Sequence, residues 1–494
     1  MPQESNEGEK TCEIILHGTN DSEHVHHATE NQHTNQLRRS ERVKKPPSYL
    51  KDFYCALNSS VESASSSPTN LISQTGSLNS TILPHTTFAL AASMHNEPKT
   101  YAEAVVDSNW KEAIDNELSA LEQNKTWTLT QLPIGKKTVG CKWVFKLKLH
   151  PDGSIERYKA RLVAQGFSQT QGVDYKDIFS PVVKMTTFRM VVSVAAVKGW
   201  HLHQLGVNTA FLHGDLNEIV YMKPPPGLHL PEPGLICKLD HSLYGLKQAS
   251  RQWNLKLANS LIDIGYTQCK HDYNMFTKQS STGFTVLLVY IDDLVLAGNN
   301  LAEINHVKRH LHDLYKIKDL GELKYFLGME VSRSKRAIAI CQRKYCLDLL
   351  KDYGMDNAKP ASTPMEYTTP LSKNSGTPLS SNSEYRRIIG RLLYLTNTKP
   401  EICYAVGKLS QFLDCATDKH FEAALRVLRY LKGVPAKGLF FSAATDLTLS
   451  GFSDSDWGTC PDSRKSITGY CFFLGTYIVS WKSKKTEHGC ILFL

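Results

Sequence analysis

The sequence predicts an α+β protein, and three observations on the order of its secondary-structure signals support this. Helical and strand patterns intermingle from about residue 100 to about residue 345. Amphipathic helical patterns follow over about 383–432, and strand patterns then return toward the carboxyl end. The chain has 494 residues, of which 41% are hydrophobic, so it can bury a large core divided over two or three domains.

Residues 1–95 differ in composition from the rest of the chain. Runs such as NSSVESASSSPTN are rich in Ser, Thr and Asn and have little hydrophobic periodicity, so we expect a disordered polar linker. Within it lies a basic segment over 38–51. Its basic residues before a Pro-Pro pair are Arg38, Arg39, Arg42, Lys44 and Lys45. This segment is either a nucleic-acid contact or nuclear import signal, or a plain charged linker.

Ordered structure is predicted to begin near Tyr101. The stretch SNWKEAIDNELSALEQN predicts a helix with Ser108 as its N-cap and one apolar face (Trp110, Ala113, Ile114, Leu118, Leu121). The segment CKWVFKLKLHPDGSIERYKARLVAQGF predicts a β-hairpin with its turn at 151–153. Two later amphipathic helices are predicted in YRRIIGRLLYLTN and HFEAALRVLRYLKGV, and strands in LTLSGFSDSDWGTC, TGYCFFLGT and YIVSWKSKK.

Charge and cysteine content narrow the class of protein. The formal net charge of +9 is compatible with a polyanionic partner without requiring one. No apolar run approaches the ~20 residues that a membrane-spanning helix needs, so no membrane partner is expected. The 12 cysteines include no C-x-x-C pair, and the polar amino terminus does not resemble a secretory signal. We therefore expect reduced thiols in a cytosolic or nuclear compartment.

The segment FTVLLVYIDDLVLAGNN predicts two apolar strands that meet at Asp292 and Asp293. Two carboxylates side by side at the mouth of an apolar hairpin repel each other and lose hydration. A hard divalent cation such as Mg²⁺ removes both penalties, because it prefers carboxylate oxygens. Since aspartate is also a common turn residue, the pair alone leaves a metal site and a simple turn both open.

The residues around this pair carry a resemblance to a known family. Tyr-Ile-Asp-Asp resembles the Y-x-D-D signature of reverse transcriptases, and the wider context is similar to the polymerase of copia-type LTR retrotransposons. The matching stretches occur in the family's order over about 100–485 and include WKEAIDNELSALEQNKTW, VNTAFLHGDL, VYMKPPPG, LYGLKQASRQW, LVYIDDLVLAG, DLGELKYFLGMEV and SDSDWGTCPDSRKSITGYCFFLG.

The resemblance implies a right-hand polymerase followed by a ribonuclease H-like α/β domain. Fingers and a palm with an antiparallel sheet would occupy 96–325, and thumb or connection helices 326–440. A truncated ribonuclease H-like domain would occupy 441–494, because the family continues after S-W-K-S-K-K into a Ser-rich turn and an acidic helix, whereas this chain reads TEHGCILFL. Asp454 matches the first ribonuclease H carboxylate, and we expect that site to be incomplete.

The resemblance also implies a set of polymerase site residues. Asp292 and Asp293 would hold two Mg²⁺ ions, and Phe211 would lie under the sugar and exclude a 2′-hydroxyl. Finger residues that would bind the triphosphate are Lys146, Lys159 and Arg161; residues beneath the incoming base and template are Tyr244, Gly245 and Gln248; the primer grip is Phe326, Leu327 and Gly328. From the residues alone, a solvent-facing strand edge is the alternative for these finger residues, equally so for Lys146, and an ordinary core position is the alternative for Phe211.

One position departs from the family's pattern. The family places an aspartate that bridges both metals in the segment that reads QLGVNTAFL here, and this chain has Gly206 at that position. Glycine supplies no carboxylate, so we expect an incomplete Mg²⁺ site and at most trace polymerase activity. Asp215 lies nine residues later and is not expected to replace it.

Two functions remain open at this stage. The first is a copia-type reverse transcriptase fragment of a Pol polyprotein, inactive in this copy. The second is a degenerate, non-catalytic nucleic-acid-binding remnant or a domesticated protein. The resemblance implies an RNA or DNA template with primer duplex and deoxynucleoside triphosphates as partners. It implies a cytoplasmic, particle-associated or nuclear location, and it fixes no oligomeric state.

Overall fold

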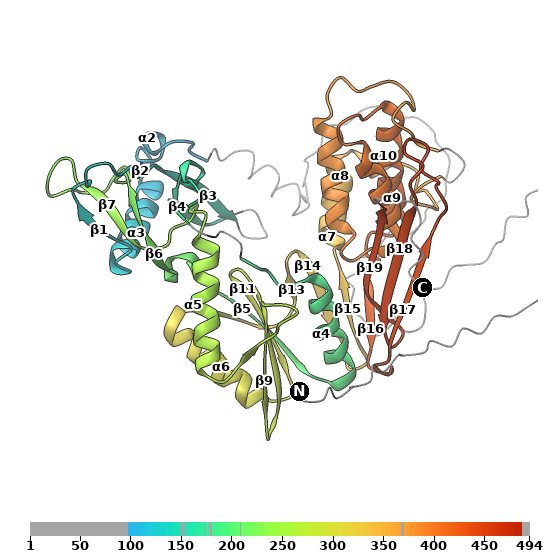
Figure 1. Ribbon diagram of the computed structural model, residues 1–494, viewed down its shortest axis with the longest axis horizontal. Coiled ribbons are helices and arrows are strands. Elements are labelled where there is room, and N and C mark those ends of the chain that lie inside the picture. Colours follow the sequence, from blue (N-terminus) through green and yellow to red (C-terminus); the bar gives the residue numbers. More distant parts are fainter. Residues whose placement is uncertain are drawn as a thin grey trace, which may run out of the picture. The chain divides into compact units, whose positions relative to one another are not determined.

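The computed structural model describes residues 97–149, 154–172, 174–175, 177, 180–207, 209–366 and 370–486 (Figure 1). All of these residues belong to one unit, Phe53–Leu494. The linker expected over 1–95, its basic segment and the hairpin turn at 151–153 lie outside the described residues. Within the described ranges, no helix combines the length and apolar character needed to cross a bilayer.

The first long helix packs on a two-stranded β-hairpin. Helix α3 (Ser108–Gln123) follows the short helix α2 (Tyr101–Ala104), and the predicted apolar face is buried apart from Ala113, which is half-buried. The predicted N-cap was wrong by one residue: Asp107 caps the helix, because its carboxylate accepts a hydrogen bond from the Asn109 amide. The predicted hairpin is confirmed as β3 (Cys141–Leu149) paired antiparallel with β4 (Ile155–Ala164).

A four-stranded sheet shares a core with this hairpin. Its strand order is β1-β7-β6-β2, with bounds Trp127–Thr130, Ile236–His241, Asp215–Met222 and Thr138–Val139 in that order. Alternate residues of β3, such as Trp143 and Phe145, are buried in the shared core together with Leu239 of β7. The period-2 alternation of β3 thus directs its lysines to the opposite, exposed face.

A six-stranded antiparallel sheet follows, in the order β12-β5-β11-β10-β9-β8. Its strands are, in that order, Lys318–Glu322, His201–Gly206, Asp293–Gly298, Gly283–Tyr290, Met275–Ser280 and Thr267–Gln268. Helices α5 (Ala249–Asp263) and α6 (Leu301–Tyr315) cover one face through Leu205 and Leu287, and α4 (Met185–Lys198) covers the other through Leu202 and Val286 (Figure 1).

A second four-stranded antiparallel sheet and a helical cluster come next. The sheet order is β13-β14-β15-β16, with bounds Tyr325–Phe326, Met329–Arg333, Ala337–Cys341 and Leu439–Ser442. The helices form a separate core and are α7 (Arg343–Asp352), α8 (Ser383–Leu395), α9 (Cys403–Leu409) and α10 (Asp418–Gly433). The two predicted amphipathic helices are confirmed as α8 and α10, and α10 begins with a capping box between Thr417 and His420.

The described chain ends in a three-stranded antiparallel sheet, as the strand patterns predict. Its strands are β17 (Leu449–Ser455), β18 (Ile467–Leu474) and β19 (Tyr477–Lys485). Leu474 and Val479 join the core beneath α4, and the buried Arg189 of α4 donates hydrogen bonds to the carbonyls of Val479 (3.0 Å) and Asn397 (3.1 Å). The remaining short elements are 3₁₀ helices: η2 (Gly166–Ser168), η3 (Ala210–His213), η4 (Met355–Asn357), η5 (Pro400–Ile402) and η6 (Ser410–Phe412).

Candidate active site

The aspartate pair lies where the hairpin of β10 and β11 turns. Tyr290 pairs with Asp293, so Ile291 and Asp292 form the turn. Ile291 has φ 57°, a left-handed conformation that costs a β-branched residue about 1–2 kcal/mol. The indole N–H of Trp253 donates to the Ile291 carbonyl at 2.8 Å, and the Val207 amide donates to the Asp292 carbonyl at 2.8 Å. These two bonds hold the strained turn in place.

Gly206 is the cross-strand partner of Asp293. Strand β5 ends at Gly206, which pairs with Asp293 on one side and with Lys318 of β12 on the other. Directly opposite residues of an antiparallel pair project on the same face with Cβ atoms about 4.5–5.5 Å apart. A side chain at position 206 would therefore stand beside the Asp293 carboxylate.

No steric feature of the strand requires glycine at position 206. A Cβ built there meets only the Leu320 Cδ1 atom within 4 Å, at 3.8 Å, which is an ordinary van der Waals contact. Gly206 is also not among the glycines with a left-handed φ. The fold therefore accommodates an aspartate at this position, and the glycine removes a side chain without serving the backbone.

Burial and repulsion act together on Asp293. Its carboxyl is half-buried, and its pKa is raised by desolvation first and then by the neighbouring Asp292 charge. A hydrogen bond from the Gln204 side chain opposes the rise. Asp292 is exposed to solvent. Gln204 lies two residues before Gly206 on the same face of β5, so its amide is already engaged beside the empty position.

The aspartate turn supplies fewer carboxylate donors than a two-metal site requires. Asp292 and Asp293 supply carboxylate oxygens suited to one hard cation whose other ligands are water. A pair of cations that share a third carboxylate does not fit these residues, because Gly206 contributes no donor. Across the described ranges, no group of three or more His, Cys, Asp or Glu side chains is arranged to hold a metal ion.

Asp215 belongs to a different sheet from the aspartate hairpin. It begins β6, and its carboxylate forms an ion pair with Lys256 of α5 (2.5 Å) and lies 3.3 Å from Nδ1 of His241 of β7. Asp177, another aspartate upstream of the hairpin, pairs with Arg251 at 3.4 Å. Both carboxylates have partners of their own outside the β5–β11 pair.

Three of the predicted nucleotide-binding residues form one stack. The Arg161 guanidinium lies 4.0 Å from the centroid of the Tyr244 ring, and Tyr244 contacts Phe211 edge-on with ring centroids 5.1 Å apart. Burial raises the pKa of Tyr244, Arg161 opposes this rise, and the charge of Asp292 adds to it. The stack therefore lies within electrostatic range of the aspartate turn.

Gly245 and Gln248 hold the loop that carries Tyr244. Gly245 has φ +90°, and a Cβ there would lie 2.1 Å from the Ala164 carbonyl oxygen, so close backbone contact with β4 requires glycine. Gln248 is fully buried, and its side chain bonds to the Gln169 amide group at 3.1 Å and to the Asp174 carbonyl at 3.3 Å. Its polar atoms are thus used inside the protein.

The predicted finger lysines lie on a cationic ribbon face. Lys146 and Lys159 are cross-strand partners, and the same face of the β3–β4 hairpin carries six basic side chains (Lys142, Lys146, Lys148, Arg157, Lys159, Arg161). Burial lowers the pKa of Lys159, and its cationic neighbours lower it further. Lys146 is tied to Glu97 by an ion pair of 3.1 Å, a partner that the sequence pattern did not indicate.

The predicted primer-grip residues form a tight hairpin turn. Leu327 (φ 50°) and Gly328 (φ 70°) connect β13 to β14, which is the backbone pattern that right-twisted two-residue hairpins favour. Phe326 is fully buried, with its ring centroid 4.6 Å from that of Phe188 and 6.4 Å from that of Tyr290. The structure therefore brings this hairpin against the tyrosine that opens the Tyr-Ile-Asp-Asp sequence.

Asp454, the predicted ribonuclease H carboxylate, lies on β17 in the last sheet. It is exposed and pairs with Gly469 of β18. The neighbouring Asp456 accepts a hydrogen bond from the Ile467 amide at 2.6 Å and another from the Thr459 hydroxyl at 2.5 Å. Asp456 thus fixes a local turn, and Asp454 does not belong to the sheet that carries Asp292.

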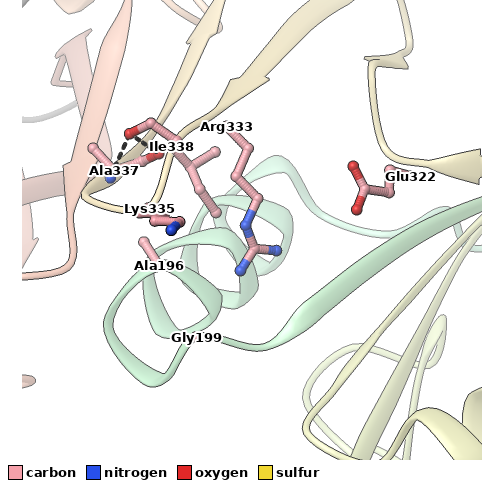
Figure 2. A pocket seen from close by; sticks show the side chains of 8 residues that line it. Ala196, Gly199, Glu322, Arg333, Lys335, Ala337 and Ile338 are labelled. Atoms are coloured by element: carbon pink, nitrogen blue, oxygen red, sulfur yellow. Dashed lines mark hydrogen bonds between the residues drawn. The ribbon is translucent and has the colours of Figure 1, made fainter. Parts of the chain in front are cut away.

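A separate hollow of about 570 Å³ lies at the end of α4. Figure 2 shows Arg333 and Lys335 near Ala196 of α4 and Gly199, the residue that follows the helix, with Glu322 across the hollow. Arg333 Nη1 donates to the Trp200 carbonyl at 2.5 Å. None of the predicted site residues lines this hollow, so it is distinct from the aspartate turn.

Comparison with known proteins assigns the class. Residues 124–367 match the family described as reverse transcriptase (RNA-dependent DNA polymerase). The retrovirus-related Pol polyprotein from transposon RE1 of Arabidopsis thaliana is 42% identical over 410 residues, covering 82% of this chain and 28% of that protein. The putative transposon Ty5-1 protein of Saccharomyces cerevisiae is 33% identical over 286 residues, covering 57% of this chain and 93% of that protein.

These matches place the chain in a family. The chain belongs to the reverse transcriptases of copia-type retrotransposon Pol polyproteins. It spans 28% of the length of the RE1 polyprotein. Among solved structures, the foamy viral protease-reverse transcriptase in complex with double-stranded DNA aligns with a TM-score of 0.42 at 12% sequence identity, over 77% of this chain and 57% of that chain.

Proposed function

We propose that this chain binds a primer–template duplex and deoxynucleoside triphosphates and carries out RNA-directed DNA synthesis at no more than a trace rate. Family membership supports the first part of the proposal. The second part depends on one observation: Gly206 stands directly across from Asp293, where the family resemblance implies the carboxylate shared by two Mg²⁺ ions. Losing one oriented catalytic group typically lowers turnover by a factor of ~10²–10³.

The nucleotide-binding part of the proposal is supported by the stack of Arg161, Tyr244 and Phe211. The guanidinium of Arg161 and the amine of Lys159 lie on one face of β4, where they would bind a triphosphate. An anion bound there would relieve the repulsion among the ribbon cations that lowers the pKa of Lys159. Phe211 would contact the sugar of the same nucleotide.

The test is primer extension on an RNA template with Mg²⁺ or Mn²⁺, comparing the chain with its Gly206→Asp variant. The variant restores a carboxylate in space that the strand leaves open, so we expect its extension rate to exceed that of the parent by at least ~10²-fold. The triple control Gly206→Asp with Asp292→Asn and Asp293→Asn should return to background. Robust extension by the parent chain, unchanged by Gly206→Asp, would contradict the proposal.

Cation binding gives a readout that does not depend on catalysis. Without a cation, an aspartate at 206 repels Asp293 and lowers stability; millimolar Mg²⁺ should remove that repulsion. We therefore expect Mg²⁺ to raise the unfolding temperature of the Gly206→Asp variant more than that of the parent. Equal shifts for both chains would mean that position 206 does not contribute to a cation site.

The second candidate function is a non-catalytic remnant that only binds nucleic acid. The cationic ribbon favours it, because phosphate contacts need no intact metal site. The two candidates differ in the response to Gly206→Asp: a chain impaired only at this position regains extension, whereas a remnant decayed elsewhere stays inactive while still binding duplex.

A further inference from the structure

Phe167 is an exposed aromatic side chain on a segment that packs against the loop carrying Tyr244. Phe167 is 79% exposed and lies on the short helix η2, directly after β4. Burying a phenylalanine normally gains about 1.5–3 kcal/mol, so a rigidly displayed ring forgoes that gain. A single exposed apolar residue is common on protein surfaces. A function for Phe167 is therefore indicated only by the contacts of its backbone and by the residues near it.

The residues on both sides of Phe167 are fixed to the loop that carries Tyr244. A Cβ at Gly166 would lie 2.2 Å from the Gly245 carbonyl oxygen, so the two backbones are in contact there. On the other side, the buried Gln169 accepts a hydrogen bond from the Lys247 amide at 3.0 Å, and its carbonyl accepts one from the Lys247 amine at 2.9 Å. The ring is therefore presented with its backbone already ordered.

Cationic and aromatic residues occur close to Phe167 in the chain, on β4 and on the loop that carries Tyr244. The Ala164 amide, three residues earlier, donates to the Tyr244 carbonyl at 2.7 Å, and Arg161 lies over the Tyr244 ring. The six basic side chains of the ribbon face begin at this end of β4 and continue along the hairpin. Proteins that bind single-stranded nucleic acid combine a positively charged track with exposed aromatic rings. The positive charges contact the phosphates, and the rings stack on the bases.

We propose that Phe167 stacks on an unpaired nucleobase of the template strand, next to the nucleotide stack at Tyr244. This inference depends on the proposed nucleic-acid-binding function. It specifies one contact residue, Phe167, and the nucleic-acid strand that the residue contacts. A duplex is not the partner of the ring, because its bases are already stacked on one another and hide their faces. The ring carries no charge, so it adds affinity for the unpaired segment without a salt-dependent contribution.

The test uses the full chain and two labelled substrates: a primer–template with an unpaired 5′ template extension, and the same duplex with blunt ends. In fluorescence anisotropy, Phe167→Ala should weaken binding of the extended substrate about 5- to 100-fold and leave the blunt duplex unchanged. Phe167→Trp should retain the preference. The matched control Phe452→Ala removes a ring that is 63% exposed on β17 and should affect neither substrate.

A spectroscopic readout separates stacking from general binding. A 2-aminopurine placed at successive unpaired template positions should be quenched by the parent chain at one of them and not by Phe167→Ala. Equal loss of affinity for both substrates, no loss for either, or quenching that survives Phe167→Ala would overturn the assignment of Phe167 without contradicting the proposed function. Failure of the parent chain to bind either substrate would overturn both this inference and the proposed function.

Discussion

At the aspartate turn, the raised pKa of Asp293 has a consequence for stability. The folded chain binds the proton of this carboxyl more tightly than the unfolded chain, whose pKa is near the ordinary value of 3.8. The protonated Asp293 carboxyl therefore makes its full favourable contribution to stability below about pH 3.8. This contribution is lost as the pH rises through the raised pKa of the folded chain. At neutral pH the ionised Asp293 destabilises the fold, by burial first and by repulsion from Asp292 second.

We predict that Asp293→Asn stabilises the chain at neutral pH and has no such effect in acid. The asparagine keeps the oxygen that accepts the hydrogen bond from Gln204 and removes the charge. Denaturant unfolding at a series of pH values measures the difference between the two chains. The control Asp115→Asn, on an exposed position of α3, should show no comparable pH dependence. A gain that is the same at all pH values would contradict the electrostatic explanation.

Among the secondary-structure elements, the hairpin of β13 and β14 depends on its turn residues. Gly328 has φ +70°, and a Cβ there would lie 2.5 Å from the Tyr394 hydroxyl oxygen, while Gly321 has φ +75° with nothing within 4 Å. The two glycines therefore share a backbone requirement and differ only in the steric contact.

We predict that Gly328→Ala lowers the free energy of unfolding by more than Gly321→Ala does. The left-handed backbone alone costs an alanine about 1–2 kcal/mol at either position, and the contact with Tyr394 adds to it at Gly328. Urea denaturation of the two variants measures both values. Equal losses would mean that Tyr394 moves aside without cost.

The elements that the sequence predicted correctly are those with strong periodicity. The alternation of β3 and the apolar stripes of α8 and α10 are local signals, because the spacing of apolar residues alone defines a buried face. The N-cap of α3 was misplaced because Asp107 and Ser108 are both good capping residues, and only the backbone geometry selects one.

The motif picks out the residues of the candidate site, but it does not show which residues they contact. Asp292, Asp293 and Gly206 were identified from the motif, and the structure adds that Gly206 faces Asp293. The Gln204 contact could have been anticipated, because residues two apart share a face of a strand. The ion pair of Glu97 with Lys146 and the exposed ring of Phe167 depend on tertiary packing, which no local pattern reports.

In the molecule as a whole, Arg189 joins α4 to two segments that lie 208 and 290 residues later in the sequence. Its guanidinium donates to the Val479 and Asn397 carbonyls and lies 4.0 Å from the centroid of the Trp481 ring, and burial lowers its pKa to about 10. Because Val479 shares its hydrophobic core with strands β10, β11, β14 and β15, the last sheet and the six-stranded sheet should unfold together.

We predict that Arg189→Ala lowers the free energy of unfolding by about 2–4 kcal/mol, since it leaves the buried Val479 carbonyl and the partly buried Asn397 carbonyl without this donor and removes the stack on Trp481. The control Lys198→Ala, exposed on the same helix, should change it by less than about 0.5 kcal/mol. Calorimetry of the parent chain should show one transition for both sheets. A variant that loses only the last sheet in a separate early transition would contradict the shared core.

The open space at position 206 bears on how long such a chain persists in a cell. Degradation by quality-control proteases follows the fraction of molecules that are unfolded, and a strand that accepts either glycine or a larger residue without steric conflict hardly changes that fraction. On the proposed function, quality-control proteases therefore do not detect the carboxylate that is missing at position 206. Where Mg²⁺ relieves the repulsion between aspartates at 206 and 293, a copy with Gly206 should accumulate to about the same level as a copy with aspartate.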